Sequence, residues 1–347
     1  MNQQHKKHFA ENKPLIGITL GDYNGIAPEI ILKTLSDTRL LSFCTPIIYA
    51  SLKILNRYRR LLHLEETYMN VIKEVEQVSH KKINIINCVD DAEIAPGQIT
   101  QEAGKAAFVS LEACTKDLLK GSIDAIVTSP INKHNIQNEH FTFVGHTEYL
   151  AENFNAPNVL MCMVKDNLRV ALLTGHLPLN EVSKQITKER IEQKLAILLQ
   201  SLQKDFGIQK PKIAVLGLNP HAGEEGLLGN EEKEIIEPVI KEFRKQGNLV
   251  YGAFPADSFF GNKRYTGYDA VLSMYHDQGL TAFKTLAFEQ GVNFTMGLPI
   301  VRTSPDHGTA YNIAGKNVAS PESMLQAIYT ACDVIKYRQG LKLALQS

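Results

Sequence analysis

Residues 15–29 read LIGITLGDYNGIAPE, in which a short apolar run, a polar loop and the beginning of a helix follow one another. The same order recurs along the chain, because short runs rich in β-branched residues alternate with longer segments of helical periodicity. Such a pattern is typical of an α/β sheet that helices cover on both faces. The predicted strands are residues 15–20, 45–50, 83–88, 124–130, 168–174, 212–218, 249–255 and 269–275, and the predicted helices are residues 28–35, 101–120, 187–206, 230–246 and 321–339.

The composition is that of a globular protein. The 347 residues include 37 Lys and Arg against 37 Asp and Glu, and 44% of them are hydrophobic. The balanced charge disfavours nucleic-acid binding by bulk electrostatics, and the apolar content disfavours disorder. Because single cores stop growing at roughly 250 to 300 residues, the length predicts two domains.

Targeting signals and cysteine usage point to the cytoplasm. No apolar run approaches the roughly 20 residues of a membrane-spanning helix, so no membrane association is expected. The N-terminal segment lacks the apolar run of a secretory signal, and we expect its first dozen residues to be frayed. Five scattered cysteines without a CxxC pair favour reduced thiols over disulfides or a thiolate zinc site.

Three polar loops carry a histidine directly after a predicted strand, namely His176, His221 and His276. In open α/β sheets ligands bind at the carboxyl ends of strands, so these loops are candidates for one shared site. Three converging imidazoles would bind a divalent ion, with zinc, cobalt or nickel favoured over magnesium, and would leave room for substrate. The spacing has no local signature such as HExxH, so the alternative that each histidine caps its own turn stays open.

The segment SPDHGTAYNIAGK, residues 304–316, is similar to the coenzyme loop of the isocitrate and isopropylmalate dehydrogenases. Gly308 and Gly315 allow the backbone to approach a ligand closely, and His307 can stack on or hydrogen-bond to an adenine ring. Neither a GxGxxG motif after a strand nor a GxxxxGK[ST] motif occurs, so a standard Rossmann or P-loop site has no support. Composition alone would favour a glycine-containing surface turn here.

Motifs along nearly the whole chain resemble, in the same order, those of the 4-hydroxythreonine-4-phosphate dehydrogenase family. They are GDYNGIAPE (21–29), TSPINK (128–133), GHTEYLA (145–151), TGHLPL (174–179), LNPHAGE (218–224), PADS (255–258), YHDQGL (275–280) and VRTSPDHGTAYNIAGK (301–316). The first motif departs from the commoner family form GDPAGIGPE at Tyr23, Asn24 and Ala27. This departure concerns the local turn more than the chemistry.

The resemblance implies a two-domain α/β/α sandwich of the isocitrate and isopropylmalate dehydrogenase type, with the active site in the cleft between the domains. It assigns residues 1–135 and 303–347 to the first domain. It assigns residues 136–302, with the metal and substrate loops and the dimer contacts, to the second. A homodimer with shared active sites is also implied.

The resemblance also assigns roles to individual residues. It identifies His176, His221 and His276 as metal ligands, with zinc first and magnesium or cobalt as alternatives. The substrate contacts it implies are His146, Thr147, Lys284, Asn293 and Arg302, and the coenzyme contacts are His307, Gly308 and Gly315. Residues 145–154 read as a loop that opens a helix, where amides and a threonine hydroxyl can hold an anion. Lys284 and Arg302 can neutralise a carboxylate and a phosphate.

The implied reaction is oxidation of a small phosphorylated hydroxy acid, 4-phosphooxy-L-threonine, at C3 by NAD or NADP. Metal-assisted decarboxylation then gives 3-amino-2-oxopropyl phosphate in pyridoxal 5′-phosphate biosynthesis. Lys284, Asp257 and Asp277 are candidates for proton transfer, and Asp277 can also orient a metal-binding imidazole.

Three alternatives stay open. The same chemistry could act on D-erythronate or D-threonate 4-phosphate, which lack the amino group. A three-histidine metallohydrolase, in which Asp277 or Asp257 activates a water, would need no dinucleotide, and the segment 304–316 argues against it. A binding protein without turnover is disfavoured by the complete set of His, Lys and Arg residues.

Overall fold

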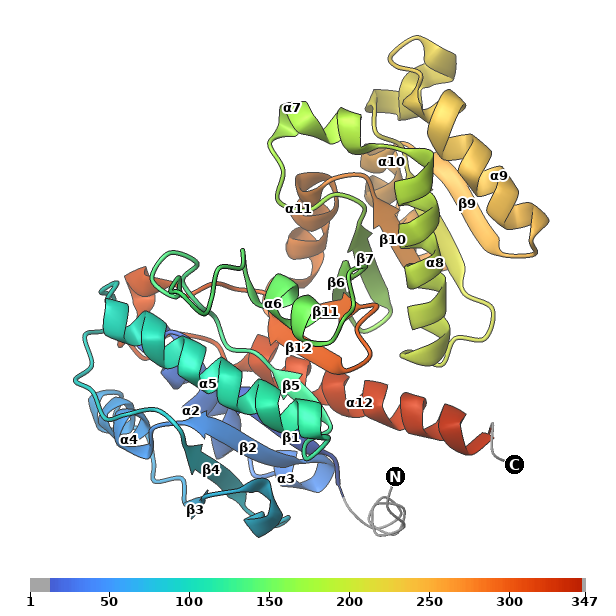
Figure 1. The fold of residues 1–347 in the computed structure, drawn as a ribbon. Coiled ribbons are helices and arrows are strands. Elements are labelled where there is room, and N and C mark those ends of the chain that lie inside the picture. The colour runs from blue at the N-terminus through green and yellow to red at the C-terminus, as the bar shows by residue number, and fades with distance from the viewer. Residues whose placement is uncertain (1–12, 345–347) are drawn as a thin grey trace. The chain divides into compact units, whose positions relative to one another are not determined.

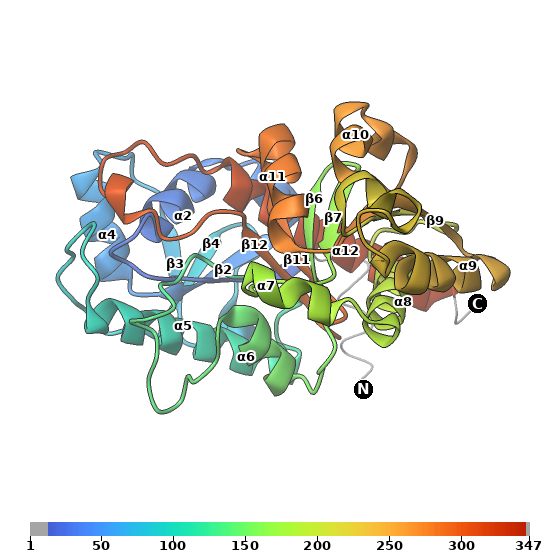
Figure 2. The same ribbon diagram turned by 90° about the horizontal axis from the view of Figure 1, so that it is seen from above.

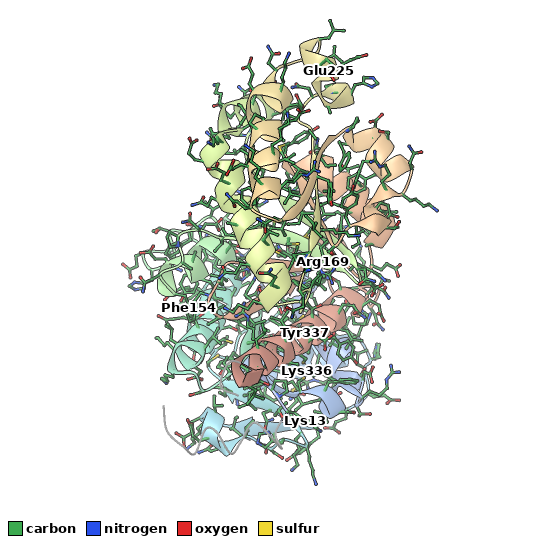
Figure 3. All side chains as sticks on the ribbon, turned by 90° about the vertical axis from the view of Figure 1, so that its right-hand side faces the viewer. Lys13, Phe154, Arg169, Glu225, Lys336 and Tyr337 are labelled. Atoms are coloured by element: carbon green, nitrogen blue, oxygen red, sulfur yellow. The ribbon has the colours of Figure 1, made fainter. Side chains whose placement is uncertain are left out.

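The computed structural model describes residues 13–344, which form two compact units. The first unit contains residues 13–155 and Pro299–Lys336, and the second contains Ala156–Leu298 and residues 337–344. Lys336 and Tyr337, where the assignment changes within one helix, are labelled in Figure 3. The residues expected to be frayed lie outside the described part of the chain. The predicted domain bounds of 135/136 and 302/303 stay a prediction, because compact units are not by themselves independently folding domains.

The first unit contains a parallel sheet. Its strands are β1 (Leu15–Thr19), β2 (Thr45–Ala50), β3 (Met69–Ile72), β4 (Ile83–Asn87), β5 (Ala125–Val127) and β12 (Val301–Pro305). They are ordered β3-β4-β2-β1-β5-β12, and each neighbouring pair is parallel (Figure 1). The loops that follow β1, β5 and β12 therefore leave from the same edge of this sheet.

Helices cover both faces of the first sheet. α2 (Ala27–Ser36) and α4 (Leu52–Leu61) pack together on one face, and α5 (Gln101–Lys120) packs against β1 and β2 on the other (Figure 2). α5 has its predicted bounds, because the Thr100 hydroxyl accepts a hydrogen bond from the Ala103 N–H at 3.2 Å and Gly121 ends the helix in the left-handed conformation. The remaining elements are α3 (Leu40–Phe43), α6 (His146–Asn153), α12 (Glu322–Ala344), η1 (Val75–Gln77) and η6 (Tyr311–Ile313).

The second unit contains a mixed sheet. Its strands are β6 (Leu160–Lys165), β7 (Leu168–Leu172), β8 (Lys212–Leu216), β9 (Leu249–Phe254), β10 (Ala270–Ser273) and β11 (Val292–Met296). They are ordered β11-β6-β7-β10-β8-β9. The pairs of β6 with β11 and β7 are antiparallel, and the strands from β7 to β9 are parallel.

Helices also cover both faces of the second sheet. α8 (Lys188–Lys204) and α9 (Glu237–Lys245) lie on one side of the strands, and α11 (His276–Ala287) lies on the other (Figure 2). The buried rings of Phe259 and Phe283 are part of the apolar cluster between α11 and β7. The remaining elements are α7 (Leu179–Val182), α10 (Ala256–Gly261), η2 (Ser183–Gln185), η3 (Pro220–Gly226), η4 (Glu232–Ile236) and η5 (Arg264–Gly267).

The α/β class predicted from the sequence is confirmed. Every predicted strand and helix has a counterpart. The strands β3, β6, β11 and β12 and the helices α3, α4, α7, α10 and α11 were not predicted. Within residues 13–344, no helix is long and apolar enough to cross a membrane.

Candidate active site

The three candidate metal ligands follow neighbouring strands of the second unit. β7, β10 and β8 lie side by side and run parallel. His176, His276 and His221 come shortly after the carboxyl ends of these strands, respectively. Parallel strands deliver such loops to one edge of a sheet, so the strand order supplies a physical reason for the three histidines to share a site.

Two of these histidines are already close together. The ring centroids of His176 and His276 are 5.4 Å apart. The Nδ1 of His276 lies 2.7 Å from the Oδ1 of Asp277, a contact that favours the tautomer whose Nε2 lone pair can bind a metal. Among the described residues, no three His, Cys, Asp or Glu side chains are placed to hold a metal ion together. The imidazoles of His176 and His276 are thus suitable ligands for a divalent ion. His221 is not placed as a third ligand beside them in this conformation.

His221 lies on an exposed segment with an unusual backbone. The five residues from His221 to Glu225 all have positive φ angles between 43° and 80°, and Glu225 is labelled in Figure 3. A left-handed conformation costs roughly 1–2 kcal/mol for each residue other than glycine. Such strain persists where the surrounding structure enforces it, often at binding sites.

The buried Glu232 holds the base of this segment. Its Oε1 accepts hydrogen bonds from the N–H groups of Leu218 and Asn219, each at 2.7 Å, and its Oε2 accepts one from the Asn219 side chain at 3.0 Å. The carboxylate of Glu232 therefore anchors Leu218 and Asn219, the residues that lead into the segment carrying His221.

The second unit also carries two predicted substrate contacts and Asp257. Lys284 is half-buried on α11, Asn293 is half-buried on β11, and Asp257 is exposed on α10. The Oδ1 atom of Asn293 is buried and has no hydrogen-bond partner among the described residues. An orphaned acceptor of this kind costs about 1–3 kcal/mol, which a ligand that donates a hydrogen bond would recover.

The other predicted substrate contacts belong to the first unit. His146 and Thr147 open α6, and Arg302 lies on β12. The buried guanidinium of Arg302 donates from Nε and Nη2 to the Thr128 hydroxyl at 3.1 and 2.8 Å. The Nε2 atom of His146 is buried and has no partner in the described part of the chain.

Burial sets the charge states of these two side chains. It holds the pKa of His146 well below its ordinary value, and the charges of Arg302 and Lys133 act in the same direction. Burial also lowers the pKa of Arg302 to about 10, with Glu148 acting in the opposite direction. At neutral pH the pair therefore consists of a cation and a neutral imidazole, which suits an anionic substrate with hydroxyl groups.

The predicted coenzyme loop packs against the loop that follows β1. The Ile26 N–H donates to the Thr309 carbonyl at 2.9 Å, and the Tyr311 hydroxyl donates to the Oδ2 of Asp22 at 2.8 Å. A Cβ added at Gly25 would lie 2.6 Å from the Thr309 carbonyl oxygen, so this close approach requires glycine.

The three predicted coenzyme residues differ in their surroundings. Gly315 has a φ of +74°, and an added Cβ would lie 2.9 Å from the Pro96 Cβ. Gly308 lies outside the left-handed region and an added Cβ would meet no atom within 4 Å. The Nδ1 of His307 is 3.3 Å from the Gly308 carbonyl oxygen. Of the two glycines, Gly315 is thus the one whose backbone conformation and close packing require glycine.

The sequence patterns gave no individual role to Thr128, Asp22 and Tyr311, although each lies within one of the motifs. Thr128 and Asp22 each follow a buried strand, which is the signal that could have found them. Tyr311 carries no such signal, because its partner Asp22 is remote in the sequence.

Comparisons with known proteins agree with the motif pattern. The family model described as pyridoxal phosphate biosynthetic protein PdxA matches residues 42–331. A 4-hydroxythreonine-4-phosphate dehydrogenase of Bacteroides thetaiotaomicron is 50% identical over 336 residues, which make up 96% of this chain and 92% of the relative. A protein of Oceanobacillus iheyensis, whose name proposes a D-threonate 4-phosphate dehydrogenase, is 39% identical over 93% of this chain and 98% of its own length.

Solved structures show the same similarity. A crystal structure of a 4-hydroxythreonine-4-phosphate dehydrogenase from Klebsiella pneumoniae has a TM-score of 0.81 and 34% identity, and covers 93% of this chain and 98% of that chain.

Proposed function

Because the chain belongs to the pyridoxal phosphate biosynthetic protein PdxA family, we propose that it oxidises 4-phosphooxy-L-threonine at C3 with NAD or NADP and decarboxylates the product. The family and the oxidoreductase class predicted from the motifs are both confirmed. The product of the proposed reaction is 3-amino-2-oxopropyl phosphate.

Two orphaned polar atoms carry this proposal. The Nε2 of His146 and the Oδ1 of Asn293 are buried without partners among the described residues, and both side chains were predicted to contact substrate. Orphaned buried polar atoms are uncommon in folded proteins, so each of the two, one in each unit, supports a polar ligand at its own position. Arg302 adds a buried cation that suits a carboxylate or phosphate group.

We assign three histidines and the segment 304–316 to cofactor binding. His176, His221 and His276 would hold a divalent ion, zinc by preference for imidazole, with cobalt or magnesium as alternatives. A bound ion would supply Lewis acidity for the oxidation and the decarboxylation, and the segment 304–316 would hold a dinucleotide that supplies the hydride acceptor. Asp277 orients the imidazole of His276 through the contact at Nδ1.

Proton transfer has three candidates. Lys284 is half-buried on α11, the helix that begins with His276, whereas Asp257 and Asp277 are exposed. Asp277 contacts His276, and all three side chains stay candidates for removing a proton from the C3 hydroxyl and returning one after decarboxylation.

We also propose that the protein is a homodimer with shared active sites and that it is located in the cytoplasm.

A second substrate is supported by the comparisons. Relatives whose names propose D-threonate 4-phosphate dehydrogenases match most of this chain at 38–40% identity. D-Threonate 4-phosphate carries a hydroxyl where 4-phosphooxy-L-threonine carries an amino group, so oxidation and decarboxylation would follow the same course and only the contact with that group would differ.

The test is turnover by the purified chain. With 4-phosphooxy-L-threonine, a divalent metal and NAD, we expect reduced dinucleotide and carbon dioxide to form in equal amounts. Omission of the dinucleotide should abolish both. Consumption of the substrate without a dinucleotide would support the metallohydrolase alternative instead.

A further inference from the structure

Asn24 lies in the loop that follows β1, and it is almost completely buried at 1% exposure. Its Oδ1 accepts a hydrogen bond from the Ala95 N–H at 2.8 Å, and its Nδ2 donates to the Thr100 hydroxyl at 3.1 Å. Its backbone carbonyl accepts from the Gly97 N–H at 2.8 Å. Asn24 thus holds the segment 95–97 and the cap of α5 at the same time.

The segment 95–97 lies directly against the predicted coenzyme loop. A Cβ added at Gly97, whose φ is +85°, would lie 3.0 Å from the Tyr311 carbonyl oxygen. The Pro96 side chain would lie 2.9 Å from a Cβ added at Gly315. Two backbone positions of the coenzyme loop are therefore in contact with residues that Asn24 holds in place.

Asn24 is also linked to that loop through Asp22. The Asn24 N–H donates to the Oδ1 of Asp22 at 2.9 Å, while the Oδ2 of the same carboxylate accepts from the Tyr311 hydroxyl at 2.8 Å and from the Asn135 side chain at 2.7 Å. Asn135 in turn donates to the Thr100 carbonyl at 2.9 Å. These hydrogen bonds link Asp22, Asn24, Thr100 and Asn135 in a closed ring around the loop that follows β1. The ring is partly buried, and the Asn135 Oδ1 has no partner among the described residues. Hydrogen bonds shielded from water in this way are electrostatically stronger than in water.

We infer that Asn24 is a positioning residue for dinucleotide binding, which it controls by holding the segment 95–97 against the coenzyme loop. The inference rests on the proposed coenzyme role of the segment 304–316. An alanine at this position would keep the backbone contacts but leave the Ala95 N–H without its acceptor. The turn at 95–97 would then move independently of Tyr311 and Gly315.

The first arm of the test needs no dinucleotide. Hydrogen exchange of the full-length chain should show faster exchange of the Ala95 amide in Asn24→Ala, on the order of tenfold, because its side-chain acceptor is lost. The control variant is Asn70→Ala, which removes a single side-chain hydrogen bond to Asn84 on the outer strands of the same unit. Unchanged protection of the Ala95 amide in Asn24→Ala would overturn the inference.

The second arm measures function. Asn24→Ala should raise the KM and Kd for NAD by roughly 2- to 30-fold, with kcat and the KM for substrate nearly unchanged, because coupling through packed neighbours is of that size. Pro96→Gly should raise the KM and Kd for NAD in the same way while keeping the Asn24 hydrogen bonds. It tests the inference if Asn24→Ala does not fold. A parallel loss in kcat and in both KM values would indicate a general structural role and contradict the inference.

The two proposals fail in different ways. If the unaltered chain does not bind NAD, the coenzyme assignment itself is wrong, and the inference falls with it. If the unaltered chain binds NAD and both Asn24→Ala and Pro96→Gly bind it equally well, the coenzyme assignment stands and the positioning role of Asn24 is wrong.

Discussion

His146 and Arg302 illustrate how local environment, rather than residue type, decides what a side chain can do. Both were predicted to contact substrate, but the sequence could not show that burial keeps His146 neutral while Arg302 stays charged at neutral pH. It also could not show that Arg302 is held by Thr128, because the two residues are separated by 174 positions. By contrast, the contact between His276 and Asp277 was foreseeable, since the two residues are adjacent.

The lowered pKa of His146 predicts a pH dependence of stability. The unfolded chain binds a proton at His146 below about pH 6.5, whereas the folded chain does so only at lower pH, so the free energy of unfolding should fall as the pH drops below about 6.5. The loss should reach at most about 1.4 kcal/mol per pH unit and end below the folded-state pKa. Denaturant unfolding at pH 7 and pH 5 measures it.

His146→Gln should flatten this dependence, because its side chain does not titrate. His134→Gln, at an exposed histidine of the same unit, is the matched control and should keep the slope of the unaltered chain. Equal slopes for His146→Gln and the unaltered chain would show that His146 does not carry the effect.

At the scale of elements, strands with continuous apolar runs and helices with clear caps were predictable. α5 is the clearest case, because Thr100 and Gly121 mark its ends in the sequence. β6 was missed because it forms an antiparallel pair with β7 across a turn at Asp166, which has a φ of +50°. β12 was missed because its run VRTSP is largely polar, although all five residues are buried. Polar side chains at a functional strand end hide the apolar signal of a strand.

The coenzyme loop gives a prediction that separates two glycines. Gly315→Ala should lower the free energy of unfolding by about 1–3 kcal/mol, because a Cβ at a φ of +74° is strained and meets Pro96. Gly308→Val should change stability much less than Gly315→Ala, since a Cβ added at Gly308 would meet no atom within 4 Å. It should still weaken NAD binding if the dinucleotide approaches the backbone there.

Calorimetric unfolding and NAD titration of both variants measure these effects. Unchanged stability of Gly315→Ala would contradict the geometry of the loop. Unchanged NAD affinity of Gly308→Val would remove Gly308 from the coenzyme site.

For the whole molecule, the family and the α/β class followed from motifs spread over the chain, but the strand order did not. No periodicity in the sequence shows that β10 lies between β7 and β8. That order delivers His176, His276 and His221 to one edge of the second sheet. The sequence could not show it, because the spacing of residues along a chain does not reveal which strands are neighbours in a sheet. The segment that carries His221 adds a left-handed run that residue types alone would not predict.

The shared metal site predicts a common loss. Each of the single variants His176→Ala, His221→Ala and His276→Ala should lose most of the one divalent ion bound per chain. A site with three protein ligands binds metal much more weakly when one ligand is removed. Elemental analysis after dialysis measures the metal, and His140→Ala, at an exposed histidine, is the control. Full metal content in all three variants would place the site elsewhere.

Substrate choice by the purified, metal-loaded chain is measured as kcat/KM for NAD reduction. 4-Phosphooxy-L-threonine is compared with D-threonate and D-erythronate 4-phosphate under identical conditions. We predict that the amino acid phosphate is preferred by roughly tenfold or more, because its ammonium group makes a charge-assisted hydrogen bond, worth about 1.5–3 kcal/mol, that a hydroxyl cannot make. Equal or reversed values, or no dinucleotide reduction with any of the three acids, would contradict it.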